Sequence, residues 1–108
     1  GAIMPGLELM RKSLFSDTAQ LPDVTVSKPM SPLGKDTVEC IRSGIVYGTA
    51  GAVERIISET EKLEAESFKI VVTGGNAEFV LPFLRKVEHI EPALVLKGLR
   101  SIYERNQQ

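Results

Sequence analysis

The chain has 108 residues, 43% of them hydrophobic and 25% charged, a composition typical of one soluble globular domain. Its 13 basic and 14 acidic residues leave a net charge of −1, which gives no support to a nucleic-acid or anionic-membrane surface. No apolar run approaches the ~20 residues of a membrane helix, and no signal-peptide pattern is visible. Cys40 is the only cysteine, which excludes a disulfide framework and a thiolate zinc site. We therefore expect a cytoplasmic protein.

The N-terminal third predicts one helix followed by a proline-rich connection. The chain opens at Gly1 in a Gly/Pro turn without an initiator methionine. Residues 5–18 are predicted to form an amphipathic helix, since Pro5 is tolerated in a first turn and apolar residues follow at helical spacing: Leu7, Met10, Leu14 and Phe15. Residues 19–33 contain three prolines around Val24–Val26, which predicts a loop or an edge segment.

A long helix is predicted from Asp36 or Thr37 to about Ala65. Either residue could cap its N-terminus, and Asp36 with Glu39 three residues later fits the capping-box pattern better. The expected apolar side consists of Ile41, Ile45, Val53, Ile56 and Ile57.

Three glycines interrupt this helix on one face. Gly44, Gly48 and Gly51 are spaced by four and three residues, and each costs roughly 1 kcal/mol of helix propensity relative to alanine. Such a stripe suggests close approach of another helix or of a ligand, and helix packing is the simpler explanation. Tyr47 lies in the same region and could line a pocket or an interface.

The segment from Phe68 to Val80 is the most informative part of the sequence. Residues 69–73 are predicted to form a strand buried on both faces, and a helix over residues 76–86 follows the pair Gly74–Gly75. Two glycines between a strand and a helix let a ligand approach the backbone, and free amides at a helix start favour an anion or a polar ring edge. An ordinary tight turn explains the pair equally well. Pro82 predicts a kink or an early stop in the helix.

The remaining sequence contains no catalytic acid, base or metal site that we can identify. Gly34–Thr37 resembles the end of a phosphate-binding P-loop, but the required glycine five positions earlier is replaced by Pro29. His89 has no metal-ligand spacing and is expected to be structural. A terminal helix is predicted over residues 93–105.

The predicted sheet is incomplete. A strand flanked by helices needs neighbours for its backbone amides and carbonyls. The two candidates, Ala2–Met4 and Val87–Ile90, are short and poor.

Six motifs in one order make the chain resemble the C-terminal part of a type III pantothenate kinase, within the acetate and sugar kinase, Hsp70 and actin superfamily. These motifs are Gly1–Gly6 (GAIMPG), Thr18–Pro22 (TAQLP), Gly34–Thr37 (GKDT), Ser43–Gly48 (SGIVYG), Val72–Gly75 (VTGG) and Gly98–Tyr103 (GLRSIY). The match covers nearly the whole chain.

This resemblance implies a fold, a reaction and three site residues. The fold is α/β, part of an actin-like (ribonuclease H-like) ATPase domain, mostly helical here with an incomplete sheet. The reaction is ATP-dependent phosphorylation of pantothenate, the first step of coenzyme A synthesis. The resemblance assigns Thr37 to pantothenate and Gly74 and Gly75 to the adenosine of ATP. It also implies Mg²⁺, a monovalent cation (potassium or ammonium) and a homodimer with the substrate site near the subunit interface.

Several family segments that would precede Gly1 are absent from the sequence. They are the phosphate-binding Asp-x-Gly-Asn-Thr, the Gly-Ala-Asp-Arg with the catalytic aspartate, and a second aspartate–glycine–threonine with the cation ligand. We therefore expect residues 1–108 to be the C-terminal part of the second actin-like domain, a fragment or one piece of a split enzyme, inactive without the missing segment or a companion chain. Two alternatives are an accessory transcriptional regulator and a dimerising interaction module.

Overall fold

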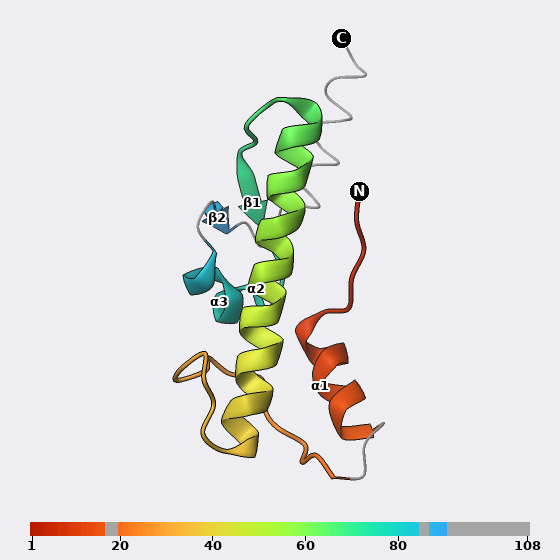
Figure 1. The fold of residues 1–108 in the computed structure, drawn as a ribbon, viewed down its shortest axis with the longest axis vertical. Coiled ribbons are helices and arrows are strands. Elements are labelled where there is room, and N and C mark those ends of the chain that lie inside the picture. The colour runs from red at the N-terminus through yellow and green to blue at the C-terminus, as the bar shows by residue number, and fades with distance from the viewer. Residues whose placement is uncertain (17–19, 85–86, 91–108) are drawn as a thin grey trace.

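The computed structural model describes residues 1–16, 20–84 and 87–90, and it is organised around one long helix. Helix α2 (Thr37–Glu64) forms the axis of the molecule (Figure 1), with α1 (Leu7–Ser16) on one side of it. On its other side lie a two-stranded sheet and a short helical segment. Their elements are β1 (Ile70–Val72), α3 (Ala77–Val80), the 3₁₀ turn η1 (Leu81–Phe83) and β2 (Val87–Ile90).

Helix α2 begins and ends where the sequence predicts. Asp36 is the N-cap, and its Oδ1 accepts a hydrogen bond of 2.8 Å from the backbone N–H of Glu39. The Glu39 carboxylate completes no capping box, because it binds Met30 and Arg42 instead. At the other end, Ala65 adopts left-handed backbone angles (φ 53°, ψ 41°) and its N–H bonds back to the last turn. Local capping chemistry therefore sets both boundaries.

Helix α1 packs against α2 through most of its predicted apolar face. Leu7 is buried, whereas Met10 and Leu14 are partly buried against the core. Phe15 was assigned to the same face but is 47% exposed, and it is the penultimate residue of α1. The helix begins two residues later than predicted, and the predicted end at residue 18 lies outside the described residues.

Arg11 links α1 to the loop that follows it. Its guanidinium pairs with Glu8 one turn away and with Asp23 in the loop. The hydrogen bond with Glu8 and the charge of Asp23 raise the pKa of Arg11, so it stays cationic.

The connection before α2 contributes to the core without forming a strand. Val24 and Val26 are buried while Thr25 between them is exposed, which is the alternation of an extended chain lying against a helix. Together with residues of the helices they form the main hydrophobic cluster: Leu7, Val24, Val26, Ile41, Ile45, Ala50 and Val80. The predicted loop is confirmed, and its two core valines are an additional finding.

Strands β1 and β2 pair in parallel, with Ile70 opposite Val87 and Val72 opposite Ile90. The poor candidate Val87–Ile90 is therefore a strand, whereas Ala2–Met4 pairs with no described strand and Ile3 is fully exposed. The prediction that β1 is buried on both faces is wrong, since Val71 is 36% exposed. Among the described residues only β2 extends this sheet, so one edge and part of one face of β1 have no cover.

The helix expected over residues 76–86 is much shorter. Helix α3 has four residues, and Pro82 lies in the 3₁₀ turn that ends at the extended residue Leu84. Proline lacks a backbone N–H and its ring clashes with the preceding turn, so the predicted early stop is confirmed. Residues 93–105, the predicted terminal helix, lie outside the described residues.

The described residues are thus mostly helical with a small sheet, as the sequence analysis expected, and the parallel pairing of its two strands is an additional finding. Within the same residues, no helix combines the length and the apolar character that a membrane crossing needs.

Candidate functional site

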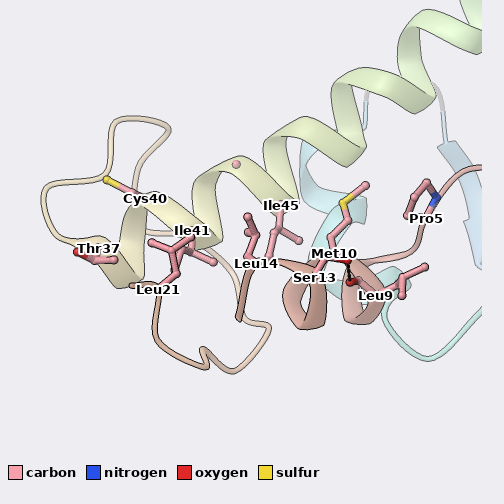
Figure 2. A pocket seen from close by; sticks show the side chains of 11 residues that line it. Pro5, Leu9, Met10, Ser13, Leu14, Leu21, Thr37, Cys40, Ile41 and Ile45 are labelled. Carbon is pink, nitrogen blue, oxygen red and sulfur yellow. Dashed lines mark hydrogen bonds between the residues drawn. The ribbon is translucent and has the colours of Figure 1, made fainter. Parts of the chain in front are cut away.

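An open apolar pocket lies between α1 and the N-terminal half of α2. Its volume is about 650 Å³. Helix α1 and the loop after it contribute Leu9, Met10, Ser13, Leu14 and Leu21, while α2 contributes Thr37, Cys40, Ile41, Gly44 and Ile45. Figure 2 shows Thr37 and Cys40 at one end of the pocket and Pro5 at the other. The sequence had indicated only Thr37 and Gly44 of this set as candidates.

Thr37 occupies the first helical position of α2 and is exposed. The capping role belongs to the preceding residue, because the Asp36 carboxylate already accepts the bond from the Glu39 N–H. Asp36 therefore serves as the cap without the Thr37 hydroxyl, and Thr37 lies at one end of the pocket (Figure 2). A threonine there offers one donor and two acceptor sites to a polar ligand.

The second candidate position is the turn after β1. Gly74 has a φ of +123°, a conformation that side chains disfavour, and its carbonyl accepts from the Ala77 N–H at 3.3 Å. A Cβ built on Gly74 or on Gly75 meets no described atom within 4 Å. The turn is therefore open to solvent, and a flat ligand can reach its backbone. Helix α3 is too short to act as an anion-binding helix terminus, so that part of the prediction is not supported by the structure.

The glycine stripe of α2 is also open. Gly44, Gly48 and Gly51 are exposed, and a Cβ at any of them meets no described atom within 4 Å. Helix packing within the described part of the chain does not explain these glycines. Tyr47 lines a second pocket of about 530 Å³ with Gly51 and Phe83, as the sequence suggested.

The two candidate positions do not share a pocket in the described structure. The Tyr47 and Phe83 rings pack with their centroids 4.5 Å apart, which fixes the segment after the glycine turn near the middle of α2. Tyr47 is ten residues along the helix from Thr37, or about 15 Å at 1.5 Å per residue. Phe83, which follows the glycine turn, therefore meets α2 about three turns from Thr37.

The described residues contain no group of three or more histidine, cysteine, aspartate or glutamate side chains that could hold a metal ion. His89 lies in β2, where its backbone pairs with Val71.

Comparison with known proteins identifies the family. The profile of the type III pantothenate kinases matches residues 1–59, which include Thr37 and the N-terminal part of α2. A type III pantothenate kinase of Rhodococcus jostii (strain RHA1) is 42% identical over 112 aligned positions, which cover 99% of this chain. Another, from Rhodococcus opacus (strain B4), is 41% identical over 111 positions, again covering 99% of this chain. The chain spans 41% of the length of each relative. With more than half of its residues matched by the family profile, this chain belongs to the type III pantothenate kinase family.

Proposed function

We propose that this chain forms part of an ATP-dependent pantothenate kinase, in which Thr37 binds pantothenate and the Gly74–Gly75 turn binds the adenosine of ATP. The observation that carries the proposal is the position of Thr37. Thr37 lies within the segment matched by the family profile and lines the pocket. The neighbouring Asp36 is the N-cap of α2, so Thr37 is not needed for that role. The relatives' names support a kinase and give no support to a transcriptional regulator.

The residues of this chain fit binding roles. The hydroxyl of Thr37 can exchange a hydrogen bond with a polar group of pantothenate, while the apolar pocket wall beside it can contact the aliphatic part. A net hydrogen bond of this kind contributes about 0.5–1.5 kcal/mol. The acceptor is thereby oriented, which is a main contribution of a protein to phosphoryl transfer.

The backbone of the Gly74–Gly75 turn carries no Cβ, and no described atom lies within 4 Å of where a Cβ would be. The edge of a nucleotide ring therefore has room to approach this backbone. ATP supplies the transferred phosphoryl group, and Mg²⁺ with a monovalent cation would neutralise its charge. In keeping with the family resemblance, the proposal assigns the cation ligands, the phosphate contacts and the catalytic base to the family segments that this sequence lacks. We also propose a cytoplasmic homodimer with an actin-like fold, of which residues 1–108 form the C-terminal part of the second domain.

The test is Thr37→Val in the complete kinase. Valine keeps the shape of threonine but removes the hydroxyl, so we expect the KM for pantothenate to rise roughly two- to tenfold, the equivalent of one lost hydrogen bond. The KM for ATP and the melting temperature should stay close to those of the parent enzyme, because Asp36 retains the cap. Steady-state kinetics with each substrate varied, together with a thermal melt, give these quantities.

Thr60→Val is the matched control. Thr60 is an exposed threonine of the same helix, and its hydroxyl bonds only to the Ile56 carbonyl at 2.7 Å in the described structure. The control should leave both KM values unchanged. A loss of about 1 kcal/mol of stability with normal pantothenate kinetics in Thr37→Val would make Thr37 a structural residue and contradict the proposal.

A further inference from the structure

The loop before α2 is held by side chains from the first two turns of that helix. The Met30 N–H donates to Glu39 Oε2 at 3.0 Å, and the Arg42 Nε–H donates to the Thr25 carbonyl at 3.3 Å. Ser43 Oγ donates to the carbonyl of Pro32. Three residues of α2 therefore bind three backbone groups of a loop that has no regular structure of its own (Figure 1).

These three side chains form what we call the loop clamp: Glu39, Arg42 and Ser43. Glu39 Oε1 also pairs with Arg42 Nη1 at 3.2 Å. The Glu39 carboxylate therefore binds both the loop, at Met30, and the Arg42 side chain. The clamp side chains are partly buried, since those of Glu39 and Arg42 are 16% and 25% exposed and Ser43 is 8% exposed. The loop residues that Glu39 and Arg42 bind, Met30 and Thr25, are exposed. The bond from Ser43 is therefore the best shielded of the three loop contacts, and a shielded hydrogen bond costs more to lose than one at an open surface.

Gly34 brings the end of the loop into direct contact with the backbone of α2. A Cβ at this position would lie 2.4 Å from the Cys40 nitrogen and 2.7 Å from the carbonyl carbon of Glu39. No side chain fits there, so the loop is packed against the first turn of the helix two residues before Asp36. The clamp and this contact together fix the segment that leads into Thr37.

The clamp and the pocket occupy different sides of α2. Thr37, Cys40, Ile41 and Gly44 line the pocket, whereas none of the clamp residues does. The clamp can therefore influence a ligand at Thr37 only through the position of the helix start and its loop.

We propose that Glu39 and Ser43 are positioning residues that hold Thr37 in the orientation required for the acceptor substrate. This inference rests on the proposed function of Thr37. It goes beyond that function because it assigns a role in acceptor recognition to two residues that do not line the pocket.

The test compares Glu39→Ala, Glu39→Gln and Ser43→Ala in the complete kinase. We expect Glu39→Ala and Ser43→Ala each to raise the KM for pantothenate roughly two- to tenfold, the effect of one lost hydrogen bond. The KM for ATP should change by less than about twofold, since the clamp does not contact the glycine turn. Glu39→Gln should restore most of the loss, because the amide oxygen can still accept from the Met30 N–H.

Matched controls come from the far end of the same helix. Glu59→Ala removes an ion-paired glutamate that is 52% exposed, and Ser58→Ala makes the serine change away from the loop. Both controls should leave the KM for pantothenate unchanged.

The decisive measurement repeats Glu39→Ala in the Thr37→Val background. If the clamp acts through Thr37, the second substitution raises the KM for pantothenate no further, because the hydroxyl to be positioned is already gone. An undiminished effect in that background, or an equal rise in the KM for both substrates, overturns the inference. If Thr37→Val itself leaves the pantothenate KM unchanged, the proposed function fails. If only the clamp variants lack an effect, the further inference alone fails.

Discussion

Adjacent residues at the start of α2 have different roles, and the structure separates them. Asp36 accepts a hydrogen bond from the Glu39 N–H and is the N-cap, whereas the neighbouring Thr37 lines the pocket. The sequence allowed either residue to cap, because aspartate and threonine are both good N-caps. The structure shows that the Asp36 carboxylate, and not the Thr37 hydroxyl, accepts the hydrogen bond from the Glu39 N–H.

The two glycines after β1 can be tested separately, because they differ in the backbone angle φ. Only Gly74 has a positive φ, whereas a Cβ on either residue meets no described atom. We therefore expect Gly75→Ala to leave the melting temperature nearly unchanged, and Gly74→Ala to lower stability by about 1–2 kcal/mol through backbone strain.

The kinetic part of this prediction tests adenosine binding. If ATP approaches the turn closely, Gly75→Ala in the complete kinase raises the KM for ATP more than the KM for pantothenate, although its fold is intact. A Gly75→Ala enzyme with parental KM values for both substrates would show that the pair is an ordinary tight turn. Urea unfolding and steady-state kinetics on the same preparations supply both measurements.

At the scale of elements, α2 was predicted well because its limits depend on local chemistry. Asp36 and the left-handed Ala65 stand immediately outside the helix, and both bond to its terminal turns. Helix α3 was predicted too long, because apolar spacing continued past Pro82 while the chain turned through η1. Phe83 packs on Tyr47 at that point, so a tertiary contact, and not helical periodicity, explains the apolar residue there.

The C-terminal cap of α2 offers a stability test. Ala65 has a φ of 53°, and a Cβ in that region costs roughly 1–2 kcal/mol. We expect Ala65→Gly to raise the free energy of unfolding by about 1 kcal/mol, since glycine adopts this conformation freely.

Ala52→Gly is the matched control, because it makes the same change inside α2. There glycine should lower the free energy of unfolding by about 1 kcal/mol. Two changes of the same sign in chemical denaturation would contradict the assigned cap geometry.

At the scale of the whole molecule, the chain spans 41% of the length of its relatives, and the sheet of the described residues has two strands. Strand β1 has one described neighbour and a partly exposed face, so its apolar residues are only half covered. The exposed glycines of α2 likewise have no described partner. Both surfaces are therefore open to further contacts in the described structure.

We expect the purified 108-residue chain to have no pantothenate kinase activity by itself. Phosphoryl transfer needs a phosphate cradle, cation ligands and a base near the attacking hydroxyl, and our proposal assigns all three to residues outside this chain. A coupled assay with ATP and pantothenate should stay at background, with the complete kinase as the positive control. ATP turnover that depends on pantothenate would refute this expectation.

The sequence by itself determined the long helix, the proline stop and the family motifs, because each depends on residues close together in the chain. The tertiary structure alone decided three other features. It paired β1 with β2 in parallel, and it buried Val24 and Val26 in a loop. It also directed Glu39 and Ser43 to the backbone of the loop instead of the helix terminus. The physical reason is that each of these contacts joins groups with several intervening residues, and local preferences cannot specify which distant partner a strand edge, a valine or a carboxylate will meet.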